Sequence, residues 1–238
     1  MRIFTPASEL PMAGHPTIGS TFALAETGVI GPGAARFVFG LGVGPTPVDL
    51  EWENGRLRFA WMTQRTPTFG PALDARDLAA RAVGLNVSDL SDQPVQEVSC
   101  GLPYVLVPLP SREMVDRATS DAAAIRRLAA SARVAPAVYP FAVLPAGSEA
   151  TVYTRMFAPD FGIGEDPATG SASGPLGCYL VRHRLVAAET AQRIINLQGV
   201  AMGRPSRMHV AIRERGAEII EVKVGGTAVL VGRGELLV

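Results

Sequence analysis

The chain has 238 residues, 47% of them hydrophobic, and its 22 basic side chains balance its 22 acidic ones. This composition is typical of a globular protein with a sizeable core, and without a basic stripe or acidic tail we expect neither nucleic acid nor a membrane as partner. We find no apolar run long enough to span a membrane and no signal peptide pattern. Two cysteines are too few for a disulfide framework or a zinc site, so a cytoplasmic location is expected.

The first half predicts a strand, a loop, a helix and a meander of strands. The helix is expected to run from about Thr17 to Glu26, with Gly28 as its terminator. Asn54-Gly55 is the strongest short hairpin signal in this half. The expected strands are 1–5, 35–39, 46–52 and 56–61, and an amphipathic helix is expected over 73–83.

The second half repeats this order after a longer opening. Its expected strands are 95–109 (interrupted at 101–103), 137–144, 150–157, 194–198, 207–212, 218–224 and 228–237, and its expected helices are 120–133 and 170–184. The order predicts an α+β fold without the crossovers of a parallel sheet. We place the first lobe at residues 1–94 and the second at 95–238, each a mostly antiparallel sheet around a central helix.

A short motif that occurs twice supports this division. Residues 2–20 and 155–171 both read R-x-F-x-P, a polar loop, then P-x-x-G-S. This alignment pairs Pro16 with Pro167 and Gly19 with Gly170, and it puts His15 and Asp166 at equivalent positions. The alternative is that the likeness is accidental.

About fifty residues of strand, helix and strand precede the motif in the second half, whereas only Met1 precedes it in the first. If the halves are true copies, the first lacks its opening strand-helix-strand. We therefore expect the first central helix to expose apolar surface or to be covered by a partner.

The two glycine-containing helix starts are candidate anion sites. Backbone N–H groups and the positive end of a helix dipole are exposed there, so two such ends facing one cleft would hold a carboxylate. Gly14, Gly170 and Ser171 are the candidate binding residues. The alternative is that each G-S pair only caps or tightens a turn.

His15 is the candidate base, because a helix N-terminus favours the neutral imidazole that a base requires. Asp166 is either a capping carboxylate or a group that charges the site or carries a proton. Glu9 and Glu165 are expected to be solvated. With neither a metal-ligand cluster nor a nucleotide fingerprint, the sequence predicts acid–base chemistry on a small organic acid, without metal or cofactor.

Four segments make the chain resemble the PhzF family of phenazine biosynthesis-like proteins: A-G-H-P-T-I-G, G-E-D-P-A-T-G-S-A, Q-G-V-A-M-G-R-P-S and V-G-R-G-E-L. The resemblance implies the diaminopimelate epimerase-like fold, a site between two lobes, cofactor-independent isomerisation of a small carboxylate and usually a homodimer. By motif position, Gly14, His15, Asp166, Gly170 and Ser171 match the family's active-site residues. The family also carries an acid/base glutamate in an opening segment that has no counterpart here.

Two functions from different classes therefore remain open. The leading one is a PhzF-like isomerase that moves a proton on a small carboxylic acid. The alternative is a catalytically impaired protein that binds a small anion or has a regulatory role, because the family's glutamate is absent.

Overall fold

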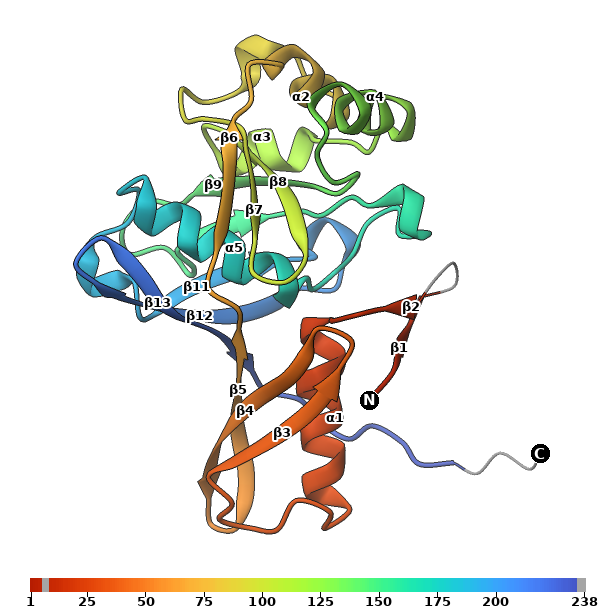
Figure 1. The fold of residues 1–238 in the computed structure, drawn as a ribbon, viewed down its shortest axis with the longest axis vertical. Helices are drawn as coiled ribbons and strands as arrows, with labels where there is room; N and C mark the ends of the chain where they lie inside the picture. The colour runs from red at the N-terminus through yellow and green to blue at the C-terminus, as the bar shows by residue number, and fades with distance from the viewer. Residues whose placement is uncertain (6–8, 235–238) are drawn as a thin grey trace.

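The computed structural model describes residues 1–5 and 9–234 and has a mixed α+β fold (Figure 1). Its strands are β1 Ile3–Phe4, β2 Glu9–Leu10, β3 Arg36–Leu41, β4 Gly44–Glu53, β5 Arg56–Gln64, β6 Thr68–Ala72, β7 Gln96–Ser99, β8 Pro103–Pro108, β9 Val138–Val143, β10 Val152–Thr154, β11 Ile194–Gln198, β12 Ser206–Arg215 and β13 Glu218–Gly226. Its helices are α1 Gly14–Glu26, α2 Arg76–Ala82, α3 Arg112–Arg117, α4 Ala122–Ala132 and α5 Gly170–Arg182.

One 11-stranded sheet organises the molecule, in the order β3-β4-β5-β13-β12-β11-β10-β9-β8-β7-β6. Most neighbouring strands pair antiparallel, as the sequence predicts, but β8 with β9 and β10 with β11 pair in parallel. The chain passes from β8 to β9 through α3 and α4 and from β10 to β11 through α5, so the expectation that no parallel crossover occurs was wrong for both units. A separate ribbon pairs β1 with β2.

The pairing of β5 with β13 joins the first-half strands β3–β5 to the second-half strands of the sheet. It runs antiparallel from Ala60 opposite Gly226 to Gln64 opposite Val222. Because β12 occupies the other edge of β13, the chain after β13 cannot pair with that strand. Residues 227–234 form no strand, so the expectation of a strand over 228–237 was wrong for these residues. The last residues of that expected strand lie outside the described part of the chain. The Asn54-Gly55 hairpin is confirmed, and both of its residues have positive φ, at 51° and 73°.

Several elements differ from the expected bounds. The first helix starts at Gly14, three residues earlier than expected. Strand β6 and helix α3 were not predicted. Strand β6 pairs with β7, and α2 packs with residues of the second half, such as Val95 and Val105. The division of the chain at residue 94 stays a prediction, and any definition of the lobes has to accommodate this packing. No described helix combines the length and apolar character that a membrane span requires.

The two central helices are equally long but unequally covered. Each has 13 residues; α5 buries 11 of them, whereas α1 buries only Gly14, Thr17, Ile18 and Thr21. Helix α5 lies between the strand pairs β7–β8 and β12–β13 (Figure 1). Helix α1 packs on one side against the strands β3, β4 and β5, and it also contacts β13 and α5. The first helix is therefore not fully covered, as the sequence analysis expected.

This difference predicts unequal protection from hydrogen exchange. Amides in α1 should exchange measurably faster than amides in α5 under native conditions, because local opening of α1 disrupts less buried packing. Residue-resolved hydrogen exchange on the same sample compares two helices of equal length. Equal protection of both helices would contradict the burial difference.

The protein's four tyrosines predict an alkaline transition. Burial raises the pKa of Tyr104 and Tyr179, and it raises the pKa of Tyr139 and Tyr153 from 10.0 to about 12. The unfolded chain loses these protons near the ordinary value, so their contribution to stability is complete below pH 10.0 and is lost as the pH rises through about 12. Ultraviolet titration of tyrosinate should show no group ionising normally in the native protein, and normal ionisation in denaturant.

Candidate active site

The N-termini of α1 and α5 meet at two glycines. A Cβ atom added to Gly14 would lie 2.6 Å from the Cα atom of Gly170, and one added to Gly170 would lie 3.1 Å from the Cα atom of Gly14. Only glycine permits two backbones to approach so closely. The positive ends of two helix dipoles therefore lie together, an arrangement suited to holding an anion.

Matching side-chain contacts show that the two helix starts are equivalent. The Thr17 hydroxyl donates to the carbonyl oxygen of Ala13 at 2.7 Å, and the Ser173 hydroxyl donates to that of Thr169 at 3.0 Å. Ala13 and Thr169 are the N-cap residues of α1 and α5. The copies therefore correspond with an offset of 156 residues at their helix starts.

This offset corrects the alignment made from the sequence. It pairs His15 with Ser171, whereas Asp166 precedes the start of α5 by four residues. Gly19 and Ser20 lie inside α1 and not at its start. The letters P-x-x-G-S match in the two copies, but the first set lies within a helix and the second set leads into one.

An arginine–glutamate pair closes each loop. Arg2 binds Glu9 through two hydrogen bonds of 2.9 and 2.8 Å, and Arg155 binds Glu165 through two of 2.8 and 2.6 Å. The side chains of the second pair are only 13% and 18% exposed, so the expectation that Glu165 is solvated was wrong. Glu9 and Glu165 also differ by 156 residues, which extends the helix-start correspondence into the loops.

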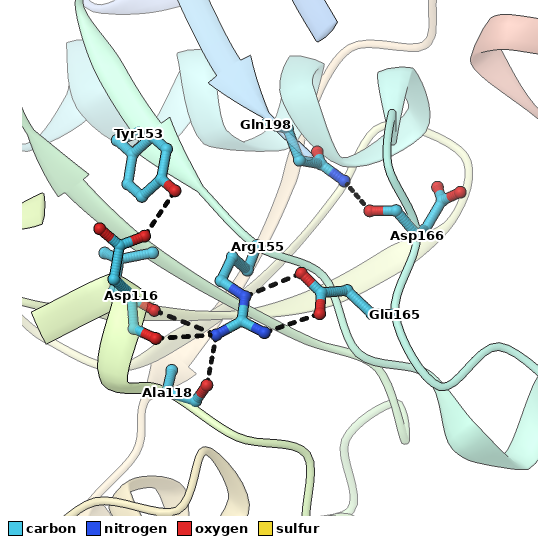
Figure 2. A network of polar contacts seen from close by, with 8 residues as sticks. Asp116, Ala118, Tyr153, Arg155, Glu165, Asp166 and Gln198 are labelled. Atoms are coloured by element: carbon cyan, nitrogen blue, oxygen red, sulfur yellow. Dashed lines mark hydrogen bonds and ion pairs between the residues drawn. The ribbon is translucent and has the colours of Figure 1, made fainter. Parts of the chain in front are cut away.

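Arg155 ties the second loop to the end of α3 (Figure 2). Its guanidinium donates to the carbonyl oxygen of Asp116 at 3.2 Å and to that of Ala118. The Tyr153 hydroxyl donates to the Asp116 carboxylate at 2.6 Å. The Glu165 carboxylate raises the pKa of Arg155, so the guanidinium keeps its charge. The loop that carries Asp166 is thus held by buried, charge-assisted bonds.

His15 lies in the first turn of α1 and reaches across to the loop of the second half. Its Nδ1 atom lies 2.7 Å from the carbonyl oxygen of Ala168. A carbonyl only accepts, so this bond places the ring proton on Nδ1 and leaves the lone pair of neutral imidazole on Nε2. His15 is exposed, and Nε2 is thereby available as a base.

Asp166 is half-buried in the same loop, two residues before Ala168. The Thr169 hydroxyl donates to Asp166 Oδ2 at 2.6 Å, and the Gln198 amide donates to the Asp166 carbonyl oxygen at 2.6 Å. In Figure 2 the carboxylate extends away from Gln198. The structure thus brings His15 and the loop of Asp166 together, as the sequence predicted, although the two residues are not equivalent in the repeat.

Two side chains that sequence analysis missed contact the start of α5. The Tyr104 hydroxyl lies 2.7 Å from Ser171 Oγ, and the Gln64 amide donates to the carbonyl oxygen of Gly170 at 2.9 Å. Burial raises the pKa of Tyr104, so it remains a neutral partner for the serine. For Tyr104 the signal available in the sequence was a hydroxyl within the apolar strand β8, because such a group needs a buried partner.

The described residues contain no cluster of three His, Cys, Asp or Glu side chains that could hold a metal ion. The sulfur atoms of Cys100 and Cys178 lie 3.8 Å apart, and both residues are completely buried in one core cluster, with Cys178 in α5 itself. The hydrogen bond with Cys100 and burial raise the pKa of Cys178. These thiols are therefore placed for packing and not for proton transfer at the helix starts.

The chain resembles known proteins in both sequence and fold. Residues 1–234 match the family model PhzC-PhzF, described as phenazine biosynthesis-like protein. The chain is 36% identical over 239 residues to trans-2,3-dihydro-3-hydroxyanthranilate isomerase of Pseudomonas chlororaphis, covering 100% of this chain and 78% of the relative. Its structure resembles that of a PhzF-family phenazine biosynthesis protein of Bacillus anthracis, with a TM-score of 0.84 and 26% identity over 100% of this chain and 80% of that one.

A more distant likeness shows the fold alone. The crystal structure of a probable proline racemase of Agrobacterium radiobacter matches with a TM-score of 0.66 and 13% identity, over 98% of this chain and 70% of that one. The fold is thus shared with a probable racemase as well as with a PhzF-family protein. From the match over residues 1–234 and the 36% identity to a curated isomerase, the chain belongs to the PhzC-PhzF family of phenazine biosynthesis-like proteins.

Proposed function

We propose that the protein is a cofactor-independent isomerase that moves a proton on a small carboxylic acid. The observation that carries this proposal is the meeting of two helix N-termini at Gly14 and Gly170, with His15 bonded to the loop of Asp166. An anion site and two proton-carrying groups are then in one region. The family relationship supports isomerase chemistry in general.

The substrate carboxylate is proposed to bind at the paired helix ends. In α5, the hydrogen bonds of the first turn begin with the N–H groups of Ala172 and Ser173, both donating to Thr169. The N–H groups of Gly170 and Ser171 precede them and belong to the orphan donors of a helix start. Glycine at both helix starts allows the two sets of N–H groups to lie close enough together to bind one carboxylate.

The proton transfer is proposed to start at His15. Nε2 takes a proton from a C–H bond, the electron pair of that bond moves into the conjugated system that ends at the substrate carboxylate, and a proton returns at another carbon. No net oxidation or reduction occurs. The Asp166 carboxylate balances the charge of the imidazolium or carries the returning proton.

The relative from Pseudomonas chlororaphis acts on trans-2,3-dihydro-3-hydroxyanthranilate, so this acid is the first candidate substrate. It combines a carboxylate with a ring in which a proton can move between carbons. The carboxylate ligand and a homodimeric assembly stay predictions.

Deuterium incorporation tests the proposed roles. Incubated with this acid in deuterated water, the native protein should introduce deuterium at carbon, as followed by NMR. His15→Gln and Asp166→Asn should each lower the rate by about 10²–10⁴-fold, because each removes a proton-carrying group. His183→Gln is the matched control. His183 follows the C-terminal end of α5, opposite the helix start, and contacts Gln96 on β7, so its loss should not change the rate.

Tight binding of the acid by the native protein without deuterium incorporation would refute the isomerase and favour the anion-binding alternative. Full activity of both site variants would refute the assigned roles.

The glycine contact provides a separate prediction. Gly14→Ala should destabilise the protein by about 1–3 kcal/mol and weaken ligand binding, because the new methyl group would force the helix ends apart. Gly19→Ala is the control on the same helix, where an added Cβ meets nothing within 4 Å. Gly19→Ala should therefore stabilise the protein by about 0.5–1 kcal/mol, because alanine is favoured over glycine inside a helix. Denaturant unfolding and ligand titration of both variants measure the difference, and equal behaviour would contradict the contact.

A further inference from the structure

Gln198, the last residue of β11, is completely buried beside the loop of Asp166 and uses its whole side-chain amide. Its oxygen accepts from the Tyr139 hydroxyl at 2.7 Å and from the Thr169 N–H at 3.2 Å. Its nitrogen donates to the Asp166 carbonyl oxygen at 2.6 Å and to the Thr169 hydroxyl oxygen at 2.9 Å. Both donors and both acceptor positions of the amide are therefore occupied.

These partners permit one orientation of the amide. If the group were rotated by half a turn, its NH₂ would face the N–H donor of Thr169, and its oxygen would face the carbonyl oxygen of Asp166. Both contacts would be repulsive, and each buried polar group left unpaired would carry a desolvation cost. Gln198 thus holds both ends of the turn from Asp166 to Thr169 with its amide in one fixed orientation.

Gln198 also fixes the direction in which the Thr169 hydroxyl donates its hydrogen. Gln198 donates to the hydroxyl oxygen, so the single hydroxyl hydrogen remains for Asp166 Oδ2 at 2.6 Å. A chain of two oriented donors thus runs from Gln198 through Thr169 to the carboxylate. Gln198 reaches the carboxylate only through Thr169.

A second set of hydrogen bonds supports Gln198 and Thr169 through Asn196 of β11. The Asn196 amide donates to the Tyr139 hydroxyl at 2.8 Å and to Ser173 Oγ at 2.9 Å, and Ser173 donates to the carbonyl oxygen of Thr169 at 3.0 Å. All of these side chains are buried. The turn is therefore anchored to β11 and to the first turn of α5, and networks satisfied in this way are rigid.

We propose that Gln198 is a positioning residue that aims the Asp166 carboxylate through Thr169 without touching the ligand. The proposal rests on the proposed function only in that Asp166 takes part in the reaction. It assigns no role to Gln198 in binding the substrate carboxylate, which belongs to the helix starts.

The test compares Gln198→Met with Gln96→Met. Gln96 is also a buried glutamine, 7% exposed, and bonds a backbone oxygen and a side chain, but it lies on β7. Gln198→Met should lower the rate of deuterium exchange about tenfold to a hundredfold, because small misplacements of reacting groups are costly. Its dissociation constant for trans-2,3-dihydro-3-hydroxyanthranilate should remain within about twofold of the native value. Gln96→Met should leave both quantities unchanged.

Thr169 supplies a second pair of variants in case Gln198→Met does not fold. Thr169→Val keeps the side-chain shape and removes the hydroxyl, whereas Thr169→Ser keeps the hydroxyl. The valine variant should show the loss expected for Gln198→Met and the serine variant should retain the native rate. If the double variant Gln198→Met/Thr169→Val folds, it should lose little more than either single variant, because both act through one donor chain.

A readout independent of activity separates this proposal from the proposed function. The NMR resonance of the isotope-labelled Asp166 carboxyl carbon should move in the Gln198→Met and Thr169→Val proteins and stay in place in Gln96→Met. Movement of the resonance, with no exchange even in the native protein, would refute the isomerase and uphold the positioning. A resonance unmoved by loss of the Thr169 hydroxyl, or equal losses of rate and binding in both glutamine variants, would overturn the positioning.

Discussion

The direct backbone contact between Gly14 and Gly170 is the constraint on which the candidate site depends. It brings two helix N-termini from distant parts of the chain together with no side chain between them. The β5–β13 pairing supports this arrangement, because α1 packs on both strands and α5 packs on β13. Gln64, at the end of β5, adds a hydrogen bond to Gly170 itself. The register of β5 with β13 and the contact between the two glycines therefore both fix the position of the α1 start relative to the α5 start.

The two halves share the same helix start and the same ion pair but bury them to different extents. Both helices begin at glycine, both bond a hydroxyl back to the N-cap carbonyl, and both follow an arginine–glutamate pair. In the second half the helix is enclosed and the ion pair is mostly buried; in the first half both are more exposed. Asp166 therefore lies on the firmly held side and His15 on the less covered side. The His15–Ala168 hydrogen bond links them.

The elements were more predictable from the sequence than the contacts between them. Asn54-Gly55 identified its hairpin because few residues other than glycine and asparagine adopt positive φ readily, and the R-x-F-x-P repeat located both loops. The alignment failed after the R-x-F-x-P segments. Gly19-Ser20 and Gly170-Ser171 are the same residue types, but the first pair lies inside its helix and the second pair begins its helix. Glu165, Gln198 and Tyr104 could not be placed, because their roles arise from partners brought close only by the sheet.

The paired arginine and glutamate have a consequence for how the loops can change. From arginine to glutamate the chain spans seven residues in the first copy, Arg2 to Glu9, and ten in the second, Arg155 to Glu165. Each span is nevertheless closed by the same two-bond ion pair, and the same number of residues leads from each glutamate to its helix. Insertions between the two anchors are thus absorbed before they reach the helix start. A difference in loop length between the two anchors therefore leaves the spacing from each glutamate to its helix start unchanged.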